Sequence, residues 1–384
     1  MSKKTNIQWC DSTVNPVMGC GGCELFPKAP RPILAAIDRE LIEQRVQGWK
    51  RGRARRLIKD LLAEAWKQLL EMIGEPGIGH INEVTTTNIY HLRKRFEERV
   101  SHIYGKSAGT LGRHVIERTI SCYAAKLHLN KGYSVVNPLR KPNVGYAPTF
   151  EQVTKFAGRM GQAAAFPDML GVDRVENPWL NGLARLIFIS DMGDALTHIA
   201  DEDFLKRELD ETQTDAGQRH LWLWLTKRPE RMKRFAASIG GLPTNLCAMT
   251  TITSTDTLHR VDYLRETDAH VRALSVEPLW TSIADDLDLT GIDWVIVGGE
   301  SGAKKNAAPF CVEWGEELKV LCQEQGVAFF FKQLGRQPTR GGAEIILDDK
   351  HGGDWNEWDD SLRVRDLPAY FHAYRQEEKP SLTC

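Results

Sequence analysis

From residue 185 onward, short apolar runs alternate along the chain with longer amphipathic stretches. Each run has six or seven residues and shows no strict alternation of apolar with polar positions. Continuous apolar runs of this length are typical of strands that are covered on both faces. We therefore predict strands at "RLIFIS" (185–190), "HLWLWLT" (220–226), "LCAMTT" (246–251), "VRALSVE" (271–277), "WVIVGG" (294–299) and "VAFFFKQ" (327–333).

The stretches between these runs predict helices. "PERMKRFAASIG" follows the second run, and "VEWGEELKVLCQEQG" ends at Gly326, which is a typical helix C-cap. "TVNPVMGC" near the N-terminus supplies one further strand. Repeated strand–helix units predict a parallel sheet that closes into a complete or partial (βα) barrel. A doubly wound open sheet is less favoured, because no G-x-G-x-x-G follows the first strand.

The segment between the first strand and the later runs breaks this pattern. Apolar residues recur at helical spacing in "RRLIKDLLAEAWKQLLEMIG", and "YHLRKRFEERVSHIYG" predicts a second helix. We therefore predict a helical insertion after the first strand. The predicted organisation is 1–23 for the first strand and the start of a cysteine motif, 24–121 for the insertion, 122–334 for the barrel and 335–384 for an irregular C-terminal extension.

Charge is distributed unevenly along the chain. The whole chain carries a net charge of −1, whereas the insertion has 18 Lys and Arg against 12 Asp and Glu, a net of +6. Its densest basic run, "WKRGRARRLIK", is either a solvated helix face or a phosphate-binding surface. The residues of that predicted surface are Arg51, Arg53, Arg55 and Arg56.

The chain has no run of 18 apolar residues, and no apolar segment follows the N-terminal lysines. We therefore predict neither a transmembrane helix nor a signal peptide, and no membrane partner. A protein of this kind is expected in the reducing cytoplasm, where cysteines can serve as thiolate ligands.

Three of the eight cysteines are candidates for one metal site. Cys20 and Cys23 form a C-x2-C pair after the first strand, and Cys122 stands where a new helix begins. If the insertion is an excursion, its two ends are neighbours and the three thiolates converge. Three thiolates suit a [4Fe-4S] cluster with one open iron, whereas His114 or His128 as a fourth ligand would give a zinc site.

The opening "TNIQWCDSTVNPVMGCGGCELFP" and the later "SCYA" resemble a phage and bacterial family of uncharacterised radical SAM-like proteins, in which SAM is S-adenosylmethionine. That family is known for a three-cysteine motif that ends in Cys-Tyr-Ala. Further matches are "FISDMGDAL", "LWLTKRPERM", "LSVEPL", "WVIVGGESG" and "FFFKQLG", which span nearly the whole chain outside the insertion. This chain departs from the commonest pattern, in which the three cysteines lie close together.

The resemblance implies a radical SAM-type barrel in which Cys20, Cys23 and Cys122 ligate a [4Fe-4S] cluster. SAM would chelate the open iron through its amino and carboxylate groups. One electron from the cluster, supplied by an external donor, would cleave the sulfonium bond and yield a 5′-deoxyadenosyl radical. The expected location is the cytoplasm, which is that of the bacterial host if the chain is phage-encoded.

Polar residues follow the apolar runs, at the strand ends where active sites of (βα) barrels gather. Individually, each could equally cap a helix or form a strand-end ion pair. As a set they predict the site that binds the cofactor SAM, with Lys227 as a partner for a carboxylate or phosphate. The candidates are Ser190, Asp191, Asp194, Thr226, Lys227, Glu277, Gly298, Gly299, Glu300, Lys332 and Gln333.

The basic insertion and the phage association favour a nucleic acid or a nucleotide as substrate. Examples are a thymine-derived base in hypermodified phage DNA and a damaged base awaiting repair, and a base inside a duplex must first be extruded. Two other classes of function remain open. One is a zinc-stabilised nucleic-acid-binding barrel without catalysis, and the other is a non-redox barrel hydrolase that uses Asp191, Glu277 and Glu300.

Overall fold

The computed structural model describes residues 2–20, 23–25, 122–129, 145–147, 150, 153–197, 201–301 and 307–375. The chain divides into two compact units, one formed by Met1–Pro16 with Phe156–Cys384 and the other by Val17–Lys155. Both helices predicted within the insertion, and the four arginines of its basic run, lie outside the described residues. Within the described part of the chain, no helix is long and apolar enough to cross a membrane.

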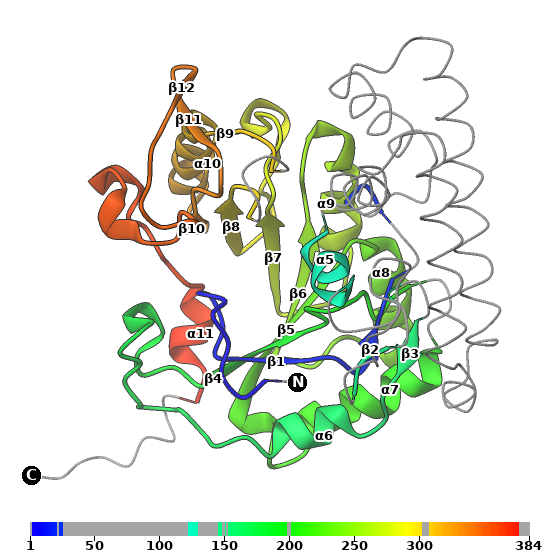
Figure 1. The fold of residues 1–384 in the computed structure, drawn as a ribbon. Coiled ribbons are helices and arrows are strands. Elements are labelled where there is room, and N and C mark those ends of the chain that lie inside the picture. Colours follow the sequence, from blue (N-terminus) through cyan, green and yellow to red (C-terminus); the bar gives the residue numbers. More distant parts are fainter. Residues whose placement is uncertain are drawn as a thin grey trace, which may run out of the picture. The chain divides into compact units, whose positions relative to one another are not determined.

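The larger unit is built on a seven-stranded parallel sheet that curls into half of a barrel (Figure 1). Its strand order, β1-β4-β5-β6-β7-β8-β10, keeps successive strands of the chain side by side, as repeated strand–helix units require. The mixed α/β fold and the six predicted strands are confirmed. The strands are β1 (Ser12–Val14), β4 (Arg185–Ile189), β5 (His220–Thr226), β6 (Leu246–Thr251), β7 (Val271–Val276), β8 (Trp294–Gly298) and β10 (Ala328–Gln333).

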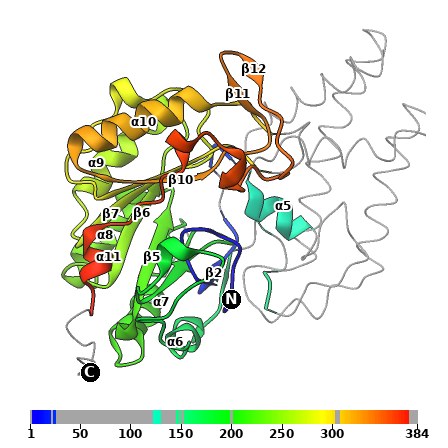
Figure 2. The same ribbon diagram turned by 90° about the vertical axis from the view of Figure 1, so that its left-hand side faces the viewer.

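Helices connect the strands, and Figure 2 shows α8, α9 and α10 on the same side of the sheet. The helices of this unit that precede the C-terminal segment are α6 (Arg159–Ala164), α7 (Glu202–Asp210), α8 (Pro229–Ile239), α9 (His259–Arg265) and α10 (Val312–Gln325). Both helices predicted for this unit, α8 and α10, are confirmed. They end at Gly240 and Gly326, whose φ angles of 80° and 69° are left-handed, a conformation that glycine adopts without steric cost.

The two faces of the half-barrel are covered differently. Alternate residues of a strand point to opposite faces, and Trp224 packs on the helix side against Phe235 of α8, with ring centroids 5.7 Å apart. On the opposite side, one apolar cluster joins residues of β4, β5, β6, β7, β8 and β10 with Trp9 and Phe371. We call this side the inner face, and its end at the carboxyl ends of the strands the mouth.

The segment after Leu334 contains short elements of its own. They are β11 (Pro338–Arg340), which pairs with β9 (Phe310–Cys311) and β12 (Ala343–Glu344), and α11 (Ala369–Ala373). Buried Arg365 lies with its guanidinium 4.0 Å from the Trp179 ring and 4.8 Å from the Trp355 ring, and donates to the Phe331 carbonyl. The hydrogen bond joins the C-terminal segment to β10, and the cation–π contact with Trp179 joins it to the segment that precedes β4.

The smaller unit contains β2 (Val17–Met18), β3 (Thr154–Lys155) and α5 (Tyr123–Leu129) among its described residues. β2 and β3 pair in an antiparallel arrangement. Helix α5 begins directly after Cys122, which confirms the predicted helix start.

Candidate functional site

Five predicted site residues continue the apolar rows of the inner face past the strand ends. Residues two or four positions apart in an extended strand lie on the same face. Ser190 lies two positions after Phe188, and Lys227 lies four positions after Leu223. Phe188 and Leu223 both belong to the inner-face cluster. Glu277, Gly298 and Lys332 likewise lie two or four positions after residues of β7, β8 and β10 that belong to this cluster. The mouth is therefore a polar layer that lies on top of an apolar core.

An ion pair crosses this layer. Lys332 Nζ lies 2.7 Å and 2.6 Å from the two carboxylate oxygens of Glu277, and the side chains are only 15% and 16% exposed. Gln333 Nε2 donates to Glu277 Oε1 at 2.9 Å and to the Gly299 carbonyl at 3.0 Å. A Cβ on Gly298 would lie 3.4 Å from Glu277 Cδ. The missing side chain of β8 therefore leaves room for a bond between β7 and β10.

Asp194 organises the ends of β4 and β5. Its Oδ1 accepts hydrogen bonds from Thr226 Oγ1 at 2.8 Å and from the Leu196 amide at 3.0 Å. Its Oδ2 accepts from the Lys227 amide at 3.1 Å and from Arg228 Nη1 at 3.0 Å. Two predicted residues, Asp194 and Thr226, therefore bind each other. Sequence reasoning missed Arg228, although it directly follows Lys227 in "TKRPERM".

Ser190 and Asp191 lie where β4 ends beside β1. Asn15, which sequence reasoning also missed, donates from Nδ2 to Asp191 and accepts from the Met192 amide at 2.8 Å. Burial raises the pKa of the Asp191 carboxyl above its usual range. Ser190 has a φ of 75°, a left-handed conformation that costs a non-glycine residue about 1–3 kcal/mol. Its buried hydroxyl has no hydrogen-bond partner among the described residues.

Gly299 and Glu300, also predicted, are held by protein atoms. A Cβ on Gly299 would lie 2.4 Å from the Leu334 carbonyl oxygen, so glycine is required where β8 and β10 end close together. Buried Glu300 accepts from the Ala308 amide at 3.2 Å. The space beside Gly299 is thus taken by the chain itself.

The smaller unit brings the two cysteine segments together. The Cys122 amide donates to the Leu25 carbonyl at 2.8 Å, and the Cys20 amide donates to the Phe150 carbonyl at 2.9 Å. The two ends of the insertion are therefore neighbours, as predicted. Cys20 is buried, whereas Cys23 and Cys122 are half-buried.

Of the two histidines considered as a fourth ligand, the structure describes only His128. His128 Nε2 lies 2.8 Å from the Ala147 carbonyl oxygen, and burial lowers the pKa of His128 to about 4. This ring is therefore neutral at physiological pH, with one nitrogen already engaged. His114 lies outside the described residues. Among the residues that the structure describes, no group of three or more His, Cys, Asp or Glu is arranged to hold a metal ion.

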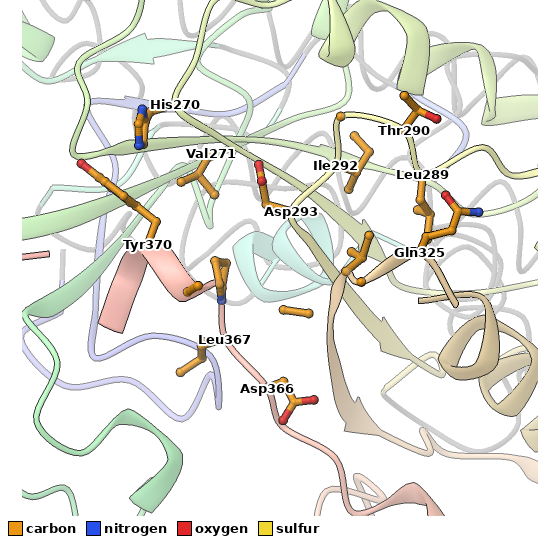
Figure 3. Close-up of a pocket in the computed structure, with 16 residues that line it drawn as sticks. His270, Val271, Leu289, Thr290, Ile292, Asp293, Gln325, Asp366, Leu367 and Tyr370 are labelled. Carbon is orange, nitrogen blue, oxygen red and sulfur yellow. The ribbon is translucent and has the colours of Figure 1, made fainter. Parts of the chain in front are cut away.

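A pocket of about 810 Å³ opens at the opposite end of the half-barrel, beside the amino ends of β7, β8 and β10. His270 and Tyr370 lie on one side of it, with ring centroids 4.1 Å apart, and Thr290 and Gln325 lie on the other (Figure 3). His270 and the acidic side chain of Asp293 are exposed. Barrel active sites gather at the other end, and we assign this pocket no chemistry.

Comparison with known proteins gives one family. Neither the curated proteins nor the solved structures provide a significant match to the chain. The profile of a family described as "protein of unknown function (DUF5131)" matches residues 121–364. The matched region is more than half of the chain and includes Cys122 and all strands of the half-barrel except β1. The chain therefore belongs to the DUF5131 family of proteins of unknown function.

Proposed function

We propose that the protein is a radical SAM enzyme that acts on a nucleobase or a nucleic acid. One observation carries the proposal, the hydrogen bond from the Cys122 amide to the Leu25 carbonyl at 2.8 Å. It joins a C-x2-C segment to a Cys-Tyr-Ala segment that is almost a hundred residues away in the sequence. The parallel half-barrel with a polar mouth supports the radical SAM type of barrel.

The donor set fits a [4Fe-4S] cluster. Cys20, Cys23 and Cys122 supply three thiolates, which is the number that leaves one iron open for SAM. In the described part of the chain these thiols are not already arranged as a metal site. When bound, the cluster supplies the electron that cleaves SAM to methionine and a 5′-deoxyadenosyl radical.

The side chains of the mouth have distinct roles in this proposal. The Asp191 carboxyl, which accepts a hydrogen bond from Asn15 Nδ2, and the Ser190 hydroxyl offer hydrogen bonds to SAM. The Glu277–Lys332 pair lines the mouth with a hydrogen-bonded ion pair that has no net charge, because each charge compensates the other. The apolar inner face beneath these residues excludes water, which protects a reactive intermediate from side reactions.

A nucleic acid is the substrate class that the charge distribution favours. The insertion carries +6 within a chain whose net charge is −1, so positive potential is concentrated in one segment. Such a segment can hold a phosphate backbone while one base is extruded toward the radical.

Metal content after anaerobic reconstitution tests the proposal. We expect about four irons and four sulfides per chain in the wild-type protein, and loss of iron in Cys20→Ala, Cys23→Ala and Cys122→Ala. Cys311→Ala is the matched control, because Cys311 is also half-buried but its Sγ lies 2.8 Å from Glu313 Oε2. Full iron in Cys122→Ala would remove this residue from the site. About one zinc per chain in place of iron would favour the non-catalytic binding barrel.

A further inference from the structure

Lys227 is a cation of the mouth that has no counter-charge among the residues that the structure describes. Its Nζ lies 3.4 Å from Thr251 Oγ1, and no carboxylate pairs with it among the described residues. Two acids of the mouth already have cationic partners, because Asp194 pairs with Arg228 at 3.0 Å and Glu277 pairs with Lys332 at 2.6 Å. Withdrawing an ammonium group from water without a counter-charge costs free energy. An anionic ligand would offset that cost.

One threonine hydroxyl, Thr251 Oγ1, lies beside this ammonium group, and a second threonine, Thr253, follows just beyond the end of β6. The register pairs Thr226 with Thr250, so Lys227, which directly follows β5, comes beside Thr251, the last residue of β6. Thr253 follows two positions later and is completely buried. Its amide donates to Thr257 Oγ1 at 2.9 Å, and its carbonyl accepts from the Trp280 amide at 2.9 Å, which fixes its backbone.

Both hydroxyls have capacity for a ligand. Thr251 Oγ1 accepts from Lys227 and so retains its own proton for donation. Thr253 Oγ1 is buried and finds no partner within the described part of the chain. A buried hydroxyl without a hydrogen bond is unfavourable, and such groups call for an explanation. The Lys227 ammonium and the two threonine hydroxyls therefore offer three donors and one positive charge at and just after the carboxyl ends of β5 and β6.

We propose that Lys227, Thr251 and Thr253 form an oxyanion subsite that takes a phosphate group of a nucleotide substrate. The subsite deepens the proposed function and rests on it. In that function the carboxylate of SAM is engaged by the open iron, which leaves the substrate phosphate as the oxyanion for Lys227. Charge-assisted hydrogen bonds from an ammonium and from hydroxyls suit phosphate oxygens.

Equilibrium dialysis of the full-length protein with thymidine 5′-monophosphate and with thymidine tests the subsite, because the two probes differ only in the phosphate. We expect the wild-type protein to bind the monophosphate about 10- to 100-fold more tightly than the nucleoside. Lys227→Met should abolish this difference, and Lys227→Arg should retain part of it. Lys206→Met, on the exposed surface of α7, is the control and should retain all of it.

Thr253→Val adds a test that a failure to fold cannot mimic. Valine keeps the shape of threonine and removes only the hydroxyl, for which the described part of the chain provides no partner. We expect the thermal midpoint of this variant to be unchanged or higher, while binding of the monophosphate weakens about three- to tenfold and binding of thymidine does not change. Unchanged binding of the monophosphate by Thr253→Val would contradict the three-donor subsite.

Other results would overturn the proposal. Equal affinity of the wild-type protein for both probes, or no binding of either, removes the phosphate subsite. If Lys227→Met weakens binding of SAM but not of the monophosphate, the occupant is the carboxylate of SAM. Iron content and SAM cleavage are measured separately on the same preparation, and the dialysis requires neither. Failure of the subsite is therefore distinguishable from failure of the radical SAM assignment.

Discussion

Replacing Lys332 with methionine should destabilise the half-barrel, because it leaves the Glu277 carboxylate desolvated beside only one neutral donor. Breaking a fully buried ion pair by removing one partner costs about 3–5 kcal/mol, and an exposed pair contributes about 0–1 kcal/mol. The side chains of Glu277 and Lys332 are 16% and 15% exposed, and two N–O distances of 2.7 Å and 2.6 Å join them. We therefore expect a loss of about 2–4 kcal/mol, near the buried limit.

Glu277→Gln should cost less, about 1–2 kcal/mol, because the amide oxygen still accepts a hydrogen bond from Lys332. The double variant removes both charges, so its cost should fall short of the sum of the single costs. We expect a coupling free energy of about 1–3 kcal/mol between the two positions.

Urea denaturation, followed by circular dichroism, measures these free energies from the midpoint and the slope of each transition. Lys206→Met is the matched control, because Lys206 pairs with Asp210 at 3.0 Å while both side chains are more than half exposed. It should change stability by less than about 0.5 kcal/mol. The reasoning is refuted if Lys332→Met costs no more than this control, or if the two single costs add within about 0.5 kcal/mol.

Three further outcomes follow from the structure and the sequence. Burial lowers the pKa of His220 to about 4, so the unfolded chain binds a proton more readily than the folded protein does. The free energy of unfolding should therefore fall by up to about 3 kcal/mol as the pH is lowered from about 6.5 to about 4. Denaturation measured across this pH range should show a flatter dependence for His220→Gln but not for His372→Gln, which replaces an exposed histidine. Gly315→Ala should lower the melting temperature despite the better helix propensity of alanine, because a Cβ there would lie 2.5 Å from Phe331 Cε2; an increase would contradict this packing. Replacement of all four arginines of the basic run by glutamine should weaken DNA or RNA binding and flatten its salt dependence by about 0.9 per lost duplex phosphate contact; a wild-type protein that binds neither nucleic acid at low salt would refute this prediction. The arginines replaced are Arg51, Arg53, Arg55 and Arg56.

The sheet could be predicted from the sequence because its strands are covered on both faces. Each of the six apolar runs from residue 185 onward is long enough to mark a strand, and the structure places these strands within one residue of the predicted limits. The strand predicted at 13–20 is instead divided between β1 and β2, which belong to different sheets. Gly240 and Gly326 likewise mark the ends of α8 and α10, because a left-handed C-cap needs glycine. Active sites of (βα) barrels gather at the carboxyl ends of the strands. The residues of the mouth can therefore be selected from the sequence without knowledge of any side-chain contact.

The partners within the mouth could not be predicted in the same way. The Glu277–Lys332 bond joins strands that are separated by β8, so it depends on the strand order, the common face and the absence of a side chain at Gly298. Asn15 lies far from Asp191 in the sequence, and only the pairing of β1 with β4 makes them neighbours. Short elements such as α11 have too few residues for a periodic signal, and tertiary packing decides their structure.

Formation of 5′-deoxyadenosine by the reconstituted protein tests the central claim most directly. SAM and a strong one-electron reductant are added anaerobically, and the nucleoside is measured by chromatography. The radical SAM assignment predicts 5′-deoxyadenosine from the wild-type protein and none from Cys122→Ala. A wild-type protein that binds about four irons but forms no 5′-deoxyadenosine, or a Cys122→Ala variant that forms as much as the wild type, would contradict it.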